Sequence, residues 1–214
     1  MRTIMVLNAK GGCGKSTLST NLASYFAVER KQKVVIIDFD PQGSSIAWLK
    51  ARGEREPLIQ GLPAWEKSVR IPKSVDVVIL DTPARVQGRE LSQLVRRVET
   101  IIVPVLPSPI DMRAAADFMK SLLLNGKISR KQTKVAVVAN RVRENTLIYQ
   151  SLQAFLKSLK IPFLTSLRDT QNYIRAEEQG IGIFEMPPSQ VWQDLEQWQP
   201  LLRWLRSKRS FPDE

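Results

Sequence analysis

Five hydrophobic runs, rich in Val and Ile, recur along the chain. Most of them lack the alternation of apolar and polar residues that marks a half-exposed strand, so we predict strands covered by helices on both faces. The runs span residues 3–7, 33–37, 75–80, 100–106 and 134–139, and a weaker sixth run spans residues 161–165.

Amphipathic stretches of helical length separate these runs, at residues 15–30, 44–52, 89–97, 111–124, 147–159, 173–179 and 190–207. Alternating strands and helices predict an α/β fold with one doubly wound, mostly parallel sheet flanked by helices. The carboxyl ends of its strands should share one edge, where ligands bind. Residues 53–74, punctuated by Gly and Pro, are predicted to form an irregular surface excursion. We expect residues 1–214 to form a single domain, because the length suffices for one core.

Composition narrows the classes of function. The chain has no histidine and one cysteine, which excludes histidine-based catalysis, a disulfide framework, an iron–sulfur cluster held by this chain alone and a cysteine-rich zinc site. A net charge of +11 favours a polyanionic partner, either nucleic acid or an acidic membrane surface. No apolar run approaches the roughly 20 residues of a membrane helix. We therefore expect a cytoplasmic protein.

A glycine-rich segment, KGGCGKST at residues 10–17, lies between the first predicted strand and the first predicted helix. That context is typical of a phosphate-binding loop. Gly11, Gly12 and Gly14 allow a tight turn that brings backbone N–H groups close to phosphate oxygens. The amino terminus of the helix adds partial positive charge at the same place.

Four side chains of this loop have distinct expected roles. Lys15 would reach the β- and γ-phosphates, and the Ser16 hydroxyl would ligate Mg²⁺. Thr17 is placed to touch the α-phosphate. Cys13 occupies a variable loop position, so we interpret it as a filler and not as a nucleophile.

The loop departs from the usual phosphate-loop pattern, because Ala9 stands where a glycine is expected and Lys10 precedes the double glycine. In this it resembles the deviant Walker motif of the ParA/MinD ATPase family, including the short ParA-type members. The resemblance extends along nearly the whole chain. Its other carriers are Asp38–Gln42, Val77–Pro83, the pair Asn140-Arg141, and the late signature Arg175-Ala176, Gly180 and Ile183–Glu185.

The resemblance implies a homodimer that sandwiches two ATP molecules, in which Lys10 crosses to the partner's ATP. It further implies that Asp40 orients the attacking water, that Asp38 supports the Mg²⁺ shell and that Asp81 holds Mg²⁺ through water. Each aspartate could instead simply cap a helix or a turn. Without a histidine or an identified arginine finger, we expect slow hydrolysis in the absence of a partner.

Adenine recognition by Asn140 and Arg141 is likewise implied by the resemblance. Guanine-specific relatives present an aspartate to the base, and residues 141–144 contain none in reach. Pro187, followed by a second proline, could form the opposite wall of the base pocket, although a rigid start of a helix is an equal alternative.

Basic residues near the carboxyl terminus, namely Arg203, Arg206, Lys208 and Arg209, are candidate contacts for non-specific DNA, which ParA-type family members bind as ATP dimers. Each could equally belong to a solvated helix face.

An apolar stripe in the same region resembles the membrane-binding helix of MinD, the rival interpretation. It consists of Val191, Leu195, Trp198, Leu202 and Leu205. Pro200 should kink such a helix, and packing on the sheet explains the stripe better. We expect no stable membrane insertion.

We therefore predict a Mg²⁺-dependent, nucleoid-associated ParA-type ATPase that positions a cargo. The cargo is a plasmid, a chromosome region or a protein organelle such as the carboxysome, and a ParB-like or McdB-like adaptor would stimulate hydrolysis. The alternatives are a MinD-like membrane-surface ATPase and a metabolic ATP-dependent ligase of the same superfamily.

Overall fold

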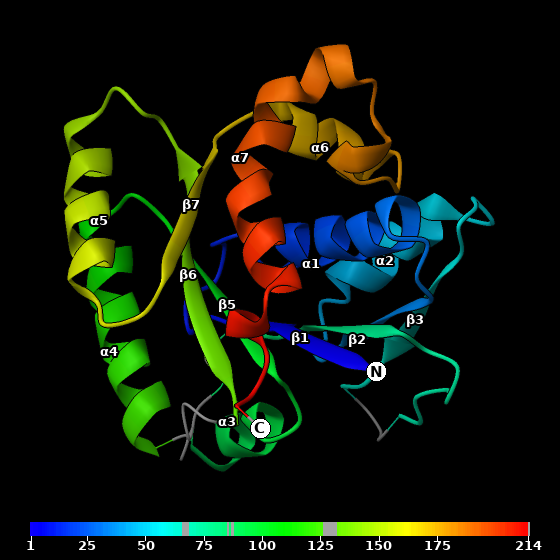
Figure 1. The fold of residues 1–214 in the computed structure, drawn as a ribbon, viewed down its shortest axis with the longest axis horizontal. Helices are drawn as coiled ribbons and strands as arrows, with labels where there is room; N and C mark the ends of the chain where they lie inside the picture. Colours follow the sequence, from blue (N-terminus) through cyan, green and yellow to red (C-terminus); the bar gives the residue numbers. More distant parts are fainter. Residues whose placement is uncertain (66–68, 85, 87, 126–131, 214) are drawn as a thin grey trace.

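The computed structural model describes residues 1–65, 69–84, 86, 88–125 and 132–213. Within these residues seven strands form one sheet in the order β3-β2-β4-β1-β5-β6-β7, and every neighbouring pair is parallel. Figure 1 shows the sheet running through the centre of the molecule. The strands are β1 Arg2–Val6, β2 Val34–Asp38, β3 Ile59–Pro63, β4 Val77–Asp81, β5 Thr100–Val105, β6 Lys134–Val142 and β7 Phe163–Arg168.

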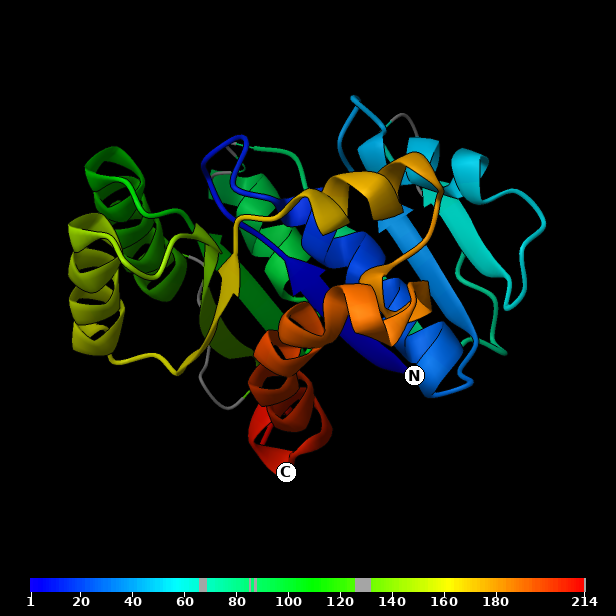
Figure 2. The ribbon, with the colours of Figure 1, turned by 90° about the horizontal axis from the view of Figure 1, so that it is seen from above.

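Helices cover both faces of the sheet, as the uninterrupted hydrophobic runs predict (Figure 2). One face packs against α1 Lys15–Ser24, which continues into a π-helical turn at Tyr25–Glu29, and against α2 Ser44–Arg52, α6 Gln171–Glu178 and α7 Pro188–Arg206. The other face packs against α3 Gly88–Val95, α4 Pro109–Asn125 and α5 Leu147–Ser158. The doubly wound α/β fold is therefore confirmed.

Strand β1 shows how the two layers are built. Ile4 and Val6 enter the hydrophobic cluster on one face, whereas Met5 and Leu7 enter the cluster on the other, and all four side chains are fully buried. Alternate side chains of a strand point to opposite faces, so a strand at the centre of such a sheet must be apolar throughout.

The edge strand β3 corrects one prediction, because it lies inside the stretch predicted to be irregular. It pairs with β2 from Ile59 to Pro63. Only Ile59 of its residues is buried, and Gly61 and Pro63 both disfavour a strand in isolation. Gly61 lets α2 pack closely on this strand, because a Cβ atom would meet the side-chain ends of Ile46 and Leu49 and displace them. The hydrophobic pattern therefore carried no signal for this strand.

Helix α7 buries its apolar stripe against the sheet. Val191 and Trp198 are 0% exposed and Leu202 is 1% exposed, whereas Trp192 on another side of the helix is 63% exposed. The helix continues through Pro200 to Arg206. The stripe thus serves packing. Because it is buried in the fold, α7 has no apolar stripe left to insert into a membrane surface as a MinD-like helix would. None of the helices in the described ranges is both long enough and apolar enough to span a bilayer.

Candidate functional site

The glycine-rich loop lies beside a cavity of about 660 Å³ at the carboxyl edge of the sheet. Elements far apart in the sequence meet here because parallel strands end at a common edge. The cavity is lined by the loop with the start of α1, by the segments that follow β2 and β4, by the end of β6, and by β7 with α6. Of the predicted site residues it includes Gly11, Gly12, Gly14, Lys15, Ser16, Thr17, Asp40, Asn140 and Arg141.

Positive φ angles at Gly12 (74°) and Gly14 (90°) confirm that the loop needs glycine at these two positions. Lys15 is 7% exposed, and its ammonium donates a hydrogen bond to the Lys10 carbonyl at 3.1 Å. The Cys13 thiol donates to the same carbonyl. Burial raises the pKa of this thiol, with the Asp111 carboxylate a smaller contributor, so Cys13 stays neutral as a filler should.

Lys10 differs from Lys15 in its surroundings. Its backbone N–H donates to Asn8 Oδ1 at 3.2 Å, and Asn8 is itself anchored by a 2.6 Å bond to the Pro104 carbonyl. The Lys10 side chain is neither part of the cavity lining nor, among the described residues, a member of any ion pair. The backbone of Lys10 is thus fixed while its ammonium has no acidic partner.

Asp38 and Asp40 end β2 with different partners. Asp38 is fully buried, and its carboxylate accepts hydrogen bonds from the Ser45 hydroxyl at 2.8 Å and from the Ile46 and Asp40 backbone N–H groups. It therefore also caps the start of α2. Asp40 borders the cavity, and one of its oxygens accepts from the Gln42 N–H.

Asp81 at the end of β4 is the least satisfied group of the site. It is 0% exposed, and neither carboxylate oxygen has a hydrogen-bond partner in the described part of the chain. Burial raises the pKa of Asp81 to about 7 and the Asp38 carboxylate adds to the rise, whereas Ser16, Ser45 and Lys15 oppose it. Orphaned buried oxygens demand a counter-charge, and a hard cation such as Mg²⁺ fits this demand.

Ser16 would share such a cation with Asp81, since its hydroxyl is among the polar neighbours of that carboxylate. No cluster of three His, Cys, Asp or Glu side chains that could hold a metal occurs among the described residues. The chain can therefore supply only part of a Mg²⁺ shell, which suits a metal that keeps waters and phosphate oxygens as its other ligands.

The predicted base-recognition residues are only partly free for that task. Asn140 is 4% exposed, and its amide donates to the Cys13 carbonyl at 2.8 Å, so it also supports the loop. Arg141 has a positive φ of 52° and a side chain that is 58% exposed. Pro187 is the residue before the first turn of α7 and is not part of the cavity lining, which matches the start-of-helix alternative.

The end of β7 and the start of α6 contribute a wall of the cavity that the sequence did not predict, which we call the Asp169 wall: Arg168, Asp169, Thr170 and Tyr173. Asp169 lies 3.5 Å from Arg141, which corrects the expectation that no aspartate is in reach of this region. Arg168 is held by a forked pair with the fully buried Asp194. Their position directly after a predicted strand, at the same sheet edge, is the signal that could have identified them.

The late signature is structural. Glu185 pairs with the buried Arg52 at 2.9 Å and accepts from the Ser24 hydroxyl at 2.8 Å. A Cβ atom on Gly180 would meet the backbone of Arg52. The signature thus joins the ends of α1 and α2 to the segment before α7. Helix α1 follows the glycine-rich loop, and α2 follows Asp40.

The four basic candidates for DNA contact are exposed and lie outside the cavity lining. Arg203 and Arg206 are on α7, and Lys208 and Arg209 are on the short 3-10 helix that follows it.

A parallel sheet with a glycine loop, a buried lysine and an orphaned aspartate at its carboxyl edge defines the class of P-loop nucleotide-binding proteins. The profile of the CobQ/CobB/MinD/ParA nucleotide-binding domain matches residues 4–183. The chain therefore belongs to this family of nucleotide-binding ATPase domains, as the motifs predicted.

Two characterised relatives are similar over most of their length. Maintenance of carboxysome distribution protein A from Halothiobacillus neapolitanus is 28% identical over 86% of this chain and 87% of its own. The chromosome-partitioning ATPase Soj from Thermus thermophilus is 25% identical over 74% and 76%.

Solved structures show the same fold. The Cyanothece McdA–ATP complex superposes with a TM-score of 0.68 at 17% identity, covering 94% of this chain and 96% of that one. MinD from Pyrococcus horikoshii, solved with Mg-ADP, has a TM-score of 0.67 at 17% identity, covering 97% and 99%.

Proposed function

We propose that this chain is a short ParA-type ATPase of one domain that binds ATP and Mg²⁺, dimerises around the nucleotide, binds DNA and positions a cargo. The observation that carries the proposal is the loop, in which a buried Lys15 lies near an orphaned Asp81 while Lys10 has no partner of its own. The ATP and Mg-ADP complexes among the solved neighbours support the choice of cofactors.

Lys15 would bind the β- and γ-phosphates after leaving the Lys10 carbonyl, and Thr17 would bind the α-phosphate. The N–H groups of Gly11, Gly12, Cys13 and Gly14 would cradle the remaining oxygens. Ser16 and Asp81 would hold Mg²⁺, with Asp38 supporting the shell from its position at the start of α2. Bound Mg²⁺ would neutralise charge on the phosphates.

Lys10 would act on the partner's nucleotide. Its backbone is anchored through Asn8, yet its side chain stays out of its own cavity. A cation on such a loop can reach a γ-phosphate presented by a second copy, and dimerisation then depends on that phosphate. Asp40, which borders the cavity, would orient the attacking water. Hydrolysis would remain slow until a partner supplies further stabilisation of the transition state.

The base would lie against Asn140 and Arg141, with Asp169 beside Arg141 at the same wall of the cavity. Because one end of the Asn140 amide supports the Cys13 carbonyl, its oxygen remains for the exocyclic amine of adenine.

The cargo is proposed from the relatives. The carboxysome-distribution protein and Soj are named for positioning a protein organelle and a chromosome, respectively. We propose that this chain positions a cargo of one of these kinds through a ParB-like or McdB-like adaptor. Its +11 charge favours non-specific attachment to nucleoid DNA in the cytoplasm.

Light scattering after size exclusion tests the dimer. Wild type with Mg-ATP should be dimeric and with ADP monomeric. Lys10→Ala should bind nucleotide but stay monomeric, whereas the control Lys50→Ala, at an exposed position on α2, should dimerise. A Lys10→Ala protein that dimerises normally would remove the crossing role.

Asp40→Ala tests hydrolysis. It should retain the ATP dimer and lose turnover, and normal phosphate release by this variant would refute the assignment. Rapid hydrolysis by wild type with neither DNA nor adaptor present would instead favour the ligase alternative.

Cosedimentation with anionic vesicles tests the MinD-like alternative. The buried stripe of α7 argues against membrane binding, so wild type with ATP should stay in the supernatant.

A further inference from the structure

The amino edge of the sheet, opposite the cavity, carries a basic surface. We call it the amino-edge surface and define it by Lys31, Lys33, Lys73, Arg97, Lys208 and Arg209, all of which are exposed. Lys31 and Lys33 precede β2, Lys73 precedes β4 and Arg97 precedes β5. The grouping depends on the fold, because these residues are far apart in the chain and only the strand order brings them to one edge.

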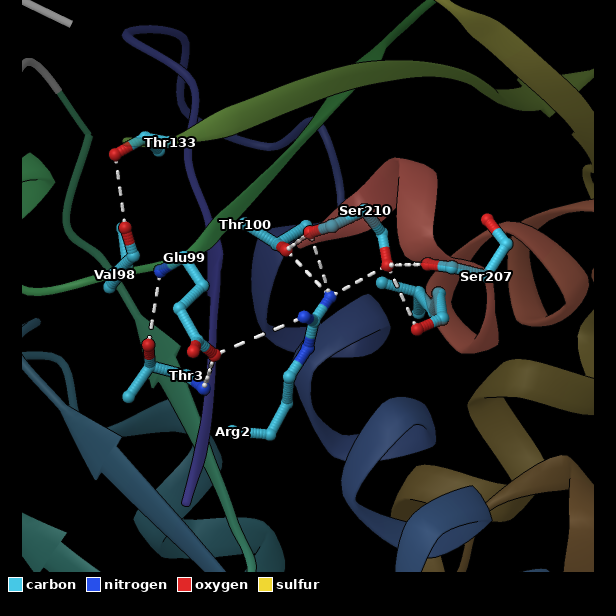
Figure 3. A network of polar contacts seen from close by, with 9 residues as sticks. Arg2, Thr3, Val98, Glu99, Thr100, Thr133, Ser207 and Ser210 are labelled. Atoms are coloured by element: carbon cyan, nitrogen blue, oxygen red, sulfur yellow. Dashed lines mark hydrogen bonds and ion pairs between the residues drawn. The ribbon is translucent and has the colours of Figure 1, made fainter. Parts of the chain in front are cut away.

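A clasp by Arg2 on Ser210, which Figure 3 shows, holds the segment that contains Lys208 and Arg209 at this edge. At the amino end of β1, one Arg2 nitrogen donates to the Ser210 carbonyl at 3.0 Å and to its hydroxyl at 2.9 Å. The Thr100 hydroxyl, at the start of β5, donates to the same carbonyl at 2.6 Å. The Arg2 guanidinium also lies 3.6 Å from the centre of the Phe211 ring. These contacts thus hold the short helix Lys208–Ser210 at the amino ends of β1 and β5.

Acidic side chains at the same edge are each oriented by another group, and those that accept backbone N–H bonds keep their negative charge. Asp76 accepts the Lys33 backbone N–H, Glu99 accepts the Thr3 N–H, and Asp213 pairs with Lys134 at 2.6 Å. Glu56 accepts the Leu58 N–H. In contrast, the six basic side chains of the amino-edge surface enter no ion pair within the described residues. Their charge remains available to a ligand, and Glu29 and Glu54, which also enter no ion pair within the described residues, add negative charge nearby.

The occupant that fits is duplex DNA. The charges come from four separate segments and are spread along a sheet edge, which suits a partner with regularly spaced charge over a long distance. Duplex DNA carries one negative charge per roughly 1.7 Å and is bound through such scattered phosphate contacts.

We infer that the amino-edge surface is the DNA-binding face, and that one ATP dimer links two duplexes. The inference rests on the proposed sandwich dimer. There the two carboxyl edges face each other, so the two amino edges point away from one another. Each lies at the far end of strands such as β1, whose five residues span roughly 17 Å.

A titration of fluorescent duplex with the ATP dimer, over a range of salt, tests the face. Lys33→Ala/Lys208→Ala/Arg209→Ala should bind at least tenfold more weakly, and its log-affinity against log-salt slope should be smaller by about 3, roughly 1 per lost phosphate contact. The control Lys120→Ala/Arg175→Ala removes exposed charges on α4 and α6 that are not part of the amino-edge surface, and it should match wild type.

A bridging assay tests the two-sided geometry. Beads bearing one unlabelled duplex are mixed with a second, labelled duplex and wild-type protein. Capture of label should require ATP, should be lost with Lys10→Ala, and should fall with the triple variant.

The outcomes separate this inference from the function on which it rests. Wild type that dimerises with ATP but binds no DNA would overturn both the DNA step and this inference. DNA binding that survives the triple variant, or is lost in the control, would overturn the face alone. Tight binding without bridging would overturn the linkage of two duplexes.

Discussion

The two edges of the same sheet treat buried charge differently. At the amino edge, Arg2 lies 3.9 Å from Glu99, and one of its nitrogens reaches three oxygens of Thr100 and Ser210, while its Nε and Nη1 make no hydrogen bond within the described residues. At the carboxyl edge, Asp81 is fully buried and neither of its carboxylate oxygens is hydrogen-bonded in the described residues. Since a buried group without partners lowers stability, Asp81 should cost the free protein stability, whereas Arg2, which has three hydrogen-bond acceptors, should contribute to it.

Asp81→Asn should have the largest effect. Folding raises the pKa of the Asp81 carboxyl from 3.8 to about 7. Ionisation of this carboxyl is therefore less favourable in the folded state than in the unfolded state, and it lowers the free energy of unfolding. The penalty is absent below pH 4, grows as the pH rises and is complete above pH 7. The shift corresponds to a penalty on the order of 4 kcal/mol. Without ligand, the variant should therefore unfold at a higher denaturant concentration than wild type at pH 8. At pH 4 the two proteins should unfold at about the same concentration.

The same variant should bind Mg-nucleotide more weakly, which is the second half of the test. Urea titrations at the two pH values measure stability, and calorimetric titration measures binding. If Asp81→Asn were less stable than wild type at pH 8, the carboxylate would have partners in solution, and the contrast between the edges would fail.

Arg2→Met should show the opposite pattern. It removes the donor to Thr100 and Ser210 and leaves those oxygens buried, which should lower the free energy of unfolding by about 3 kcal/mol. Nucleotide affinity should be unchanged, because the cavity is at the other edge. Arg96→Met, at an exposed position, serves as the control in the same denaturant series. A loss of nucleotide affinity in Arg2→Met would show that the edges are not independent.

Lys15→Ala tests a single proposed contact to nucleotide at the carboxyl edge. In the free protein the one hydrogen bond that the ammonium makes within the described residues is to the Lys10 carbonyl, so stability should change little. Loss of a charge-assisted bond to phosphate should weaken nucleotide binding roughly 30-fold, about 2 kcal/mol. A fluorescent-nucleotide titration measures this, with Lys10→Ala as the matched lysine that should keep its affinity. Equal losses in the two variants would show that both lysines bind the chain's own nucleotide.

Features of the structure that depend on neighbouring residues could be predicted from the sequence, whereas features that depend on distant contacts could not. The buried strands and the loop could be predicted, because Val and Ile runs and the glycines of residues 10–17 act through their neighbours in the chain. β3 could not, since its pairing with β2 outweighs its Gly61 and Pro63. The Asp169 wall and the Arg2 clasp were also missed, because each depends on contacts between residues distant in sequence. The roles of Lys10, Asp40 and the DNA contacts stay predictions.

Asp38 gives a finer comparison within the carboxyl edge, because it neighbours Asp81 yet accepts three hydrogen bonds. Ser45→Ala removes the one that comes from a fully buried hydroxyl at 2.8 Å, and it should lower the free energy of unfolding by about 1 kcal/mol. Ser151→Ala, whose exposed hydroxyl bonds only to the carbonyl of Leu147 in its own helix, should change it by much less. Parallel urea titrations at pH 8 decide the matter. Equal effects of the two substitutions would mean that Asp38 gains no stability from the Ser45 hydroxyl, and the contrast between a hydrogen-bonded Asp38 and an orphaned Asp81 would then lose its basis.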